Sequence, residues 1–183
     1  LVLLVALVFI LFALCIYIMS GQAYEIRMYA IHTYGYVIHE FDPWFNYRAT
    51  EYLDENGWHA FFHWFDYESW YPLGRPVGTT IYPGMQITSV VLKKVLNTLF
   101  SGTGGKPYIS LNDVCCLVPA WFGVTATWFL GLLAQECSGS RSAGAAAALV
   151  MSIVPAHIMR SVGGGYDNES IAMTAMMATF FCC

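Results

Sequence analysis

Long uncharged hydrophobic runs alternate with one extended polar segment along the chain. Residues 1–19 carry no charged side chain, and a helix of that length can cross the ~30 Å hydrocarbon core of a bilayer. The runs at 111–135 and 142–159 predict a second and a third transmembrane helix, and 171–183 begins a fourth that is truncated. A cleaved signal peptide is the alternative for the first run, but its apolar core would be shorter. We expect an all-α polytopic membrane protein, present here as a fragment.

The polar segment, residues 20–110, predicts a long loop between the first two spans. Aromatic rings crowd it, as is typical of a membrane–water interface. Two stretches within it, at about 43–56 and 79–100, predict amphipathic helices. The side chains of the second helix expected to face lipid or protein are Met85, Val91, Leu92, Val95 and Leu99.

Whether the stretch at 79–100 crosses the membrane decides the topology. Its uncharged part would span about 21 Å as a helix, which is short for a bilayer, and Lys93 and Lys94 then interrupt it. We interpret it as an interfacial helix whose lysines reach water. With this helix outside the membrane, the segment after the first span and the segment at 160–170 lie on the same side.

The composition narrows the classes of function. With 57% hydrophobic and 11% charged residues, the chain fits an integral membrane protein rather than a soluble domain. A net charge of −4 without a basic run argues against nucleic acid as a partner. The six cysteines show neither a disulfide framework nor zinc-ligand spacing. Chemistry is therefore expected from acidic residues at the ends of the spans.

Asp42 stands in the first polar segment, where a lipid-borne and a water-borne substrate could meet. It is followed by Pro43, and such a pair commonly begins a helix with the aspartate as N-cap and the proline at the first helical position. Capping alone would explain this aspartate. A second acidic cluster further along makes a shared metal ion the competing interpretation.

That second cluster is Asp167 and Glu169, which follow three glycines at 163–165. The glycines allow the backbone to turn tightly enough to aim both carboxylates at one point. Hard oxygen ligands of this kind suit Mg²⁺ or Mn²⁺ rather than zinc. The alternative is a helix start, with Asp167 as N-cap and Glu169 in the first turn. The spacing leaves both interpretations open.

Two arginines are candidates for binding a phosphate. Arg160 precedes the second acidic cluster, and Arg75 lies in a turn-rich stretch at 69–78. Either could pair with a phosphate or anchor its segment at the interface, and anchoring is the commoner role. Together with Trp44, which follows the first acidic position, they form the candidate substrate-binding set.

Three segments carry a resemblance to a known family. They lie at 39–48, 69–75 and 160–169 and read His-Glu-Phe-Asp-Pro-Trp-Phe-Asn-Tyr-Arg, Ser-Trp-Tyr-Pro-Leu-Gly-Arg and Arg-Ser-Val-Gly-Gly-Gly-Tyr-Asp-Asn-Glu. In length and order they resemble the N-terminal part of the catalytic subunit of eukaryotic oligosaccharyltransferase. The resemblance covers nearly the whole chain. The chain departs from the family pattern at the three glycines 163–165, where the family often has a mixture of Ala, Gly and Ser.

The resemblance implies a membrane glycosyltransferase with a GT-C type helix bundle and a long lumenal first loop bearing interfacial helices. Such an enzyme moves a preassembled oligosaccharide from a dolichyl pyrophosphate carrier to the side-chain amide of Asn in Asn-x-Ser/Thr. It implies a multi-pass protein of the endoplasmic reticulum membrane with lumenal acidic loops. Its partners would be the lipid-linked donor, the acceptor polypeptide, membrane lipid and other oligosaccharyltransferase subunits.

By motif match, the resemblance implies that Asp42 binds a metal ion and the acceptor amide, while Asp167 and Glu169 complete this half of the cation site. The cofactor would be Mn²⁺ or Mg²⁺. The family's further acidic residue, its acceptor-recognition motif and its soluble C-terminal domain are not found in these 183 residues. We therefore expect the fragment to be inactive alone.

Two alternatives belong to other classes. One is a different GT-C glycosyltransferase that uses a lipid-linked sugar, such as a mannosyltransferase, which would lack the acceptor-recognition motif. The other is a cation channel or transporter. A channel predicts paired charges within the spans, whereas 1–19 and 114–134 contain none.

Overall fold

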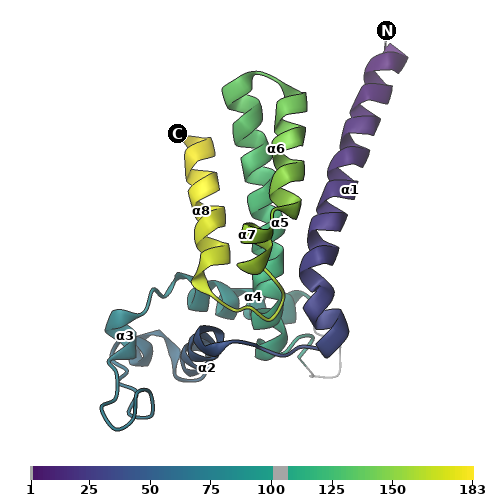
Figure 1. Cartoon of the computed structure of the whole chain (residues 1–183). Coiled ribbons are helices and arrows are strands. Elements are labelled where there is room, and N and C mark those ends of the chain that lie inside the picture. Colours follow the sequence, from purple (N-terminus) through teal and green to yellow (C-terminus); the bar gives the residue numbers. More distant parts are fainter. Residues whose placement is uncertain (1, 101–106) are drawn as a thin grey trace. The chain divides into compact units, whose positions relative to one another are not determined.

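A computed structural model describes the backbone of residues 2–100 and 107–183, with side chains for Leu14 and from Tyr17 onward. All regular elements in these ranges are α-helices (Figure 1). Their order is α1 (Val2–Tyr34), α2 (Phe41–Phe62), α3 (Val77–Thr80), α4 (Gly84–Phe100), α5 (Leu111–Ser138), α6 (Arg141–Ile153), α7 (Pro155–Met159) and α8 (Asn168–Cys182).

The chain divides into two compact units. Unit 1 comprises Leu1–Gly35, Pro119–Gly163 and Glu169–Cys183, and unit 2 comprises Tyr36–Val118 and Gly164–Asn168. The short segment 164–168, far along the chain, is therefore part of the unit built mainly from the polar segment.

Helix α1 is longer than the first predicted span. The predicted loop starts at residue 20, but the helix continues to Tyr34. It continues because Ala23, Arg27 and Ile31, which share one helical face, are all buried. Gly35 then ends it with a positive φ of 81°, and its N–H donates to the Ile31 carbonyl over 2.8 Å. The helix therefore extends 15 residues beyond the first predicted span, and the start of the predicted lumenal segment at residue 20 stays a prediction.

Helices α5 and α6 run side by side as an antiparallel hairpin in unit 1 (Figure 1). A Cβ on Gly131 would lie 3.0 Å from the Ala148 Cβ, and one on Gly144 would lie 2.7 Å from the Gly131 carbonyl oxygen. The small side chains therefore let the two backbones approach closely. The predicted helix 142–159 is in fact two helices, because Pro155 holds Val154 in an extended conformation between them.

One helix in the described ranges, α5, is long and apolar enough to cross a membrane by length and composition. Helix α6, with 13 residues, is apolar but short. Most side chains of the first predicted span, 1–19, lie outside the described residues. The four predicted spans thus remain predictions.

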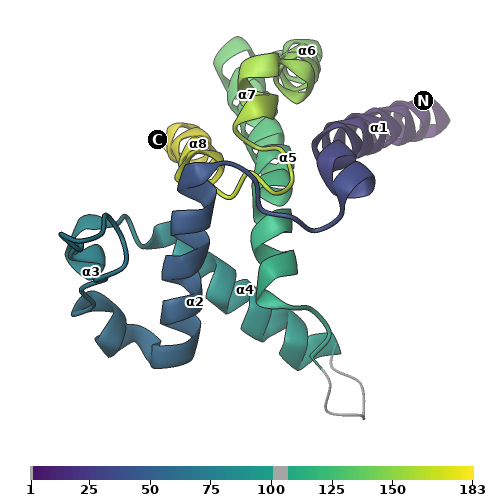
Figure 2. The same cartoon turned by 60° about the horizontal axis from the view of Figure 1, so that its bottom comes forward.

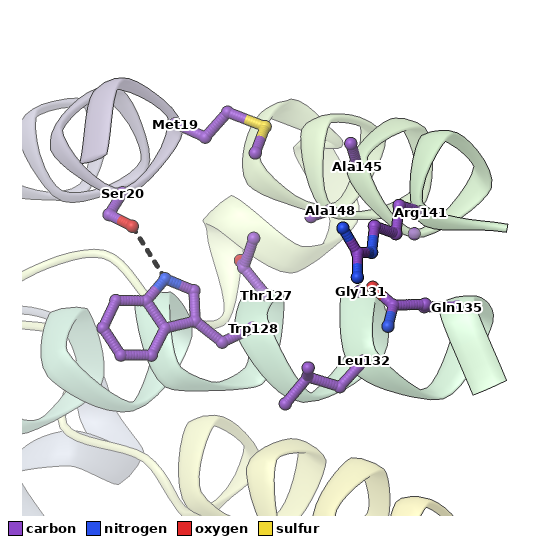
Figure 3. A pocket seen from close by; sticks show the side chains of 11 residues that line it. Met19, Ser20, Thr127, Trp128, Gly131, Leu132, Gln135, Arg141, Ala145 and Ala148 are labelled. Carbon is purple, nitrogen blue, oxygen red and sulfur yellow. Dashed lines mark hydrogen bonds between the residues drawn. The ribbon is translucent and has the colours of Figure 1, made fainter. Parts of the chain in front are cut away.

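Unit 1 contains a cavity of about 380 Å³ between α1, α5 and α6 (Figure 3). The Trp128 indole N–H donates to Ser20 Oγ over 2.7 Å at one end, and Gln135 and Arg141 lie at the other. The remaining lining is small or apolar: Met19, Thr127, Gly131, Leu132, Gly144, Ala145 and Ala148. None of the residues predicted to carry chemistry lines this cavity.

Unit 2 is built around the packing of α2 on α4 (Figure 2). Its buried hydrophobic core is Ala49, Leu53, Phe61, Val77 and Val90. The predicted helix at 43–56 begins two residues earlier and does not end at Asn56. Instead, Gly57 kinks it with φ 77° and ψ 178°, and the helix resumes to Phe62.

Helix α4 buries a mixed face rather than a purely apolar one. Met85, Gln86, Ser89 and Val90 are buried against the rest of unit 2. Val91, Val95 and Leu99 are exposed, on the face that the sequence assigns to lipid or protein. Lys93 does not extend into water as expected, because its ammonium group pairs with the Asp54 carboxylate.

Candidate functional site

The segments that precede the two acidic clusters are joined within unit 2. The His39 N–H donates to the Gly164 carbonyl over 3.2 Å, and the Gly164 N–H donates to the Cys116 carbonyl over 3.0 Å. Gly164 has a φ of +87°, and a Cβ there would collide with the Val37 carbonyl oxygen. Glycine is therefore required at this crossing, which explains at least one member of the triple glycine.

Tyr166 fastens the second acidic segment to α2 and α4. Its side chain is fully buried. The hydroxyl donates to Ser89 Oγ over 2.7 Å and shares a hydrogen bond of 2.9 Å with Thr50 Oγ1. Burial raises the pKa of this hydroxyl well above its usual value, so it remains a neutral donor. The residue before Asp167 is thus fixed by two helices.

Asp167 itself contacts α2. Its Oδ1 accepts a hydrogen bond of 2.7 Å from the Asn168 N–H and one of 3.3 Å from Asn46 Nδ2. The same Asn46 amide donates to the Tyr166 carbonyl over 3.3 Å. Asp167 directly precedes α8, as its interpretation as a helix cap predicts. A capping position and a contact with α2 coexist at this residue.

Asp42 is exposed in the first turn of α2 and is not the N-cap. The N-cap is Glu40, which has a positive φ of 74° and makes no side-chain capping hydrogen bond. The capping interpretation of Asp42 is therefore wrong. Because Asp42 and Asn46 are four residues apart on one helix, they share a face. Asp42 thus lies about one turn from the amide that contacts Asp167.

Glu169 belongs to unit 1, where it faces Arg160. The Arg160 Nε lies 3.1 Å from Glu169 Oε2, and both side chains are about half exposed. Although the ion pair is close, this oxygen atom is buried and accepts no hydrogen bond from the described residues. Arg160 is thus neither an isolated anchor nor a free phosphate ligand in this structure.

These residues have the donor chemistry for a hard cation. Within unit 2, Asp167 contacts Asn46, one helical turn after Asp42, and in unit 1 the buried Glu169 Oε2 lacks a hydrogen-bond donor among the described residues. All three offer oxygen, which fits Mg²⁺ or Mn²⁺. Within the described residues, no group of three or more His, Cys, Asp and Glu side chains converges on one point. The metal site remains a proposal.

Of the other candidate binding residues, Arg75 has a local role. Its guanidinium lies 4.7 Å from the centre of the Phe45 ring and 5.3 Å from that of Trp70, and Nε donates to Thr80 Oγ1 over 3.1 Å. Cation–π contacts of this kind hold a loop to a helix. Trp44, two residues after Asp42 on α2, is exposed, with its ring edge-on to Tyr47.

The sequence interpretation missed a buried aspartate that organises the turn-rich stretch. Asp66 is 2% exposed and accepts two hydrogen bonds from Arg48, at 2.9 and 3.1 Å, and one of 2.6 Å from Ser69. Burial alone would raise the pKa of Asp66, but the hydrogen bonds from Ser69, the Glu68 N–H and Arg48 hold it below its usual value. No spacing signal distinguished Asp66 from the other acids of the segment.

Comparison with known proteins identifies the family. Residues 6–183 match the family model described as oligosaccharyl transferase STT3, N-terminal. The chain therefore belongs to the STT3 family.

Curated relatives are named as subunits of the same family. The chain is 44% identical over 174 residues to the dolichyl-diphosphooligosaccharide–protein glycosyltransferase subunit stt3 of Schizosaccharomyces pombe, which covers 93% of this chain and 21% of the relative. It is 46% identical over 161 residues to the STT3 subunit of Saccharomyces cerevisiae, covering 87% of this chain and 21% of that one. The chain thus spans about one fifth of the length of the relatives it matches.

A solved structure agrees with this assignment. The crystal structure of the apo Archaeoglobus fulgidus oligosaccharyltransferase superimposes with a TM-score of 0.67 at 26% identity. The match covers 92% of this chain and 19% of the archaeal one. The helical arrangement described above is therefore similar to that of about one fifth of the archaeal oligosaccharyltransferase.

Proposed function

We propose that this chain is the N-terminal part of a full-length catalytic subunit that transfers a preassembled oligosaccharide. The donor is dolichyl pyrophosphate oligosaccharide, and the acceptor is the side-chain amide of Asn in Asn-x-Ser/Thr. The STT3 family match supports this reaction over another lipid-linked sugar transferase and over a channel. The observation that carries the proposal is the contact of Asn46 with Asp167, one helical turn from Asp42.

Each acidic side chain has a distinct task in this proposal. Asp42, exposed at the start of α2, accepts hydrogen bonds from the acceptor amide and orients a poor nucleophile. Asp167 and Glu169 hold Mn²⁺ or Mg²⁺. When bound, the cation supplies positive charge that stabilises the departing pyrophosphate.

The donor and acceptor need binding groups beyond the acids. Arg160 pairs with Glu169 and offers a guanidinium group to a pyrophosphate oxygen. Trp44 presents an exposed ring in the first turn of α2, which suits contact with a sugar or peptide. Arg75 supports this surface through its stacking on Phe45.

The cellular setting follows from the same proposal. The subunit is a multi-pass protein of the endoplasmic reticulum membrane, and both acidic segments face the lumen. The exposed apolar stripe of Val91, Val95 and Leu99 on α4 suits an interfacial helix in contact with membrane lipid. Other oligosaccharyltransferase subunits are expected partners of the full-length protein.

The test is transfer of oligosaccharide to an Asn-x-Thr peptide by the full-length subunit in its native assembly. Transfer should require Mn²⁺ or Mg²⁺, and Asp42→Ala and Asp167→Ala should each reduce it at least 100-fold, on the order expected for loss of an electrostatic catalytic group. A Gln-x-Thr peptide is the matched acceptor control. Undiminished transfer in both variants would show that Asp42 and Asp167 have structural rather than catalytic roles.

A further inference from the structure

The side chain of Asn46 contacts Asp167 and so links the start of α2, which contains Asp42, to the segment that contains Asp167. It is 4% exposed and lies on α2, one turn after Asp42. We infer that Asn46, oriented by Gln86, is a positioning residue that holds the Asp167 carboxylate for cation binding. This inference rests on the proposed function, because it assumes that Asp167 is a metal ligand.

The hydrogen bonds fix the orientation of the Asn46 amide. Its Nδ2 faces two acceptors, the Tyr166 carbonyl oxygen and Asp167 Oδ1, each at 3.3 Å. Its Oδ1 accepts from Gln86 Nε2 over 3.3 Å. A flipped amide would point oxygen at oxygen on one side and nitrogen at nitrogen on the other. Gln86 on α4 therefore orients the Asn46 amide so that its Nδ2 donates to Asp167 Oδ1.

Gln86 has a cost in stability that an apolar residue at position 86 would not have. It is fully buried, and its Oε1 finds no hydrogen-bond donor among the described residues. A buried carbonyl without a donor costs free energy, and an apolar side chain of the same shape would avoid that cost. Its one hydrogen bond to Asn46 is what the glutamine contributes. Removing Gln86 deletes this unpaired carbonyl but also leaves the buried Asn46 Oδ1 without its donor, so the two effects on stability oppose each other.

A neutral donor is the suitable group at position 46. An N–H bond to Oδ1 fixes the plane of the Asp167 carboxylate without adding charge. A carboxylate at position 46 would instead lie beside Asp167 and repel it, while an apolar side chain would remove the hydrogen bond that ties the Asp167 carboxylate to α2. Groups that orient metal ligands in this way typically change metal affinity 10–100-fold when removed.

The experiment measures Mn²⁺ binding directly, by electron paramagnetic resonance titration of the full-length subunit, together with its thermal midpoint without metal. Asn46→Leu and Gln86→Met remove the two amides at nearly constant volume. Thr50→Val is the matched control, since Thr50 lies one turn further along α2 and is bonded to Tyr166 but not to Asp167. Asp167→Ala reports whether this carboxylate is a ligand at all.

We expect Mn²⁺ affinity to fall about 10-fold or more in Asn46→Leu and several-fold in Gln86→Met. The Gln86→Met midpoint should stay close to that of wild type, because one unpaired buried oxygen replaces another. Thr50→Val should bind Mn²⁺ within about twofold of wild type. Gln86→Met carries the test if Asn46→Leu does not fold. One result would overturn the positioning role alone: Mn²⁺ binding is lost in Asp167→Ala, but Gln86→Met and any folded Asn46→Leu bind Mn²⁺ with wild-type affinity. Unchanged binding in Asp167→Ala would overturn the proposed metal site and this inference together.

Discussion

The His39 N–H and the Gly164 carbonyl oxygen form a hydrogen bond of 3.2 Å that joins the segment before Asp42 to the segment before Asp167. Both partners belong to unit 2. The contact depends on the positive φ of Gly164 and on its lack of a side chain. The two acidic segments are therefore held together by backbone geometry as well as by side chains.

Gly164→Ala should disrupt this crossing. An alanine at φ +87° costs about 1–2 kcal/mol of backbone strain, and its Cβ would also collide with the Val37 carbonyl. Gly139→Ala is the control, because Gly139 has a φ of +64° but nothing within 4 Å of its Cβ position. Thermal unfolding of the full-length subunit should show a clearly larger loss for Gly164→Ala. Equal losses would mean that the close approach does not matter.

Arg27→Met should destabilise unit 1 by about 2–4 kcal/mol. The buried Arg27 guanidinium donates to Ser161 Oγ over 2.8 Å and to the carbonyls of Ala23 and Ser152 over 2.7 and 3.1 Å. A methionine fills the space but removes these hydrogen bonds from the buried acceptors. Unfolding by denaturant measures the loss. Lys94→Met, at an exposed position, should stay within about 0.5 kcal/mol, and a similar result for Arg27→Met would contradict the account.

Acid should selectively weaken the Arg48–Asp66 contact. The folded-state pKa of Asp66 is lowered, so its stabilisation is complete above the unfolded pKa of about 3.9 and is lost as the pH falls through the lower folded value. The difference in stability between wild type and Asp66→Asn should therefore be constant from pH 5 to 7 and shrink below about pH 4. Glu55→Gln, at an exposed side chain, is the control. A difference that persists unchanged at pH 2 would refute this assignment.

Arg160→Gln separates substrate binding from folding. The Arg160–Glu169 pair is half exposed, so its loss should cost less than about 1 kcal/mol of stability. If Arg160 contacts pyrophosphate, the KM for the lipid-linked donor should rise about 10-fold or more, with the acceptor KM unchanged. Steady-state kinetics with each substrate varied in turn provide the measurement. A parallel rise in both KM values would point to a general disturbance of the site.

The sequence predicted the two acidic segments and, from the topology, that they lie on the same side of the membrane. The two segments contact each other within unit 2, and their side of the membrane stays a prediction. It also predicted most helices, because apolar runs and Pro or Gly breaks are local signals. The extension of α1 to Tyr34 was missed, because Arg27 is polar by type and its burial depends on acceptors from other parts of unit 1.

The supporting residues of the site were not predictable from local pattern. Gln86 and Ser89 lie on the buried face of α4, although periodicity assigns polar residues of an amphipathic helix to water. The Asp-Pro pair predicted Asp42 as the N-cap of α2, but the N-cap is Glu40, which has a positive φ. Both errors arise from tertiary contacts that a single sequence does not encode locally.

The most direct test of the central claim is a double-mutant cycle of Asp42→Asn and Asp167→Asn. The rate of glycosyl transfer by the full-length subunit is measured at saturating and limiting Mn²⁺. If the two carboxylates act in one site, the double variant should lose little more activity than the worse single variant. If their losses simply multiply, the two acids act independently, and the single shared site proposed here is wrong.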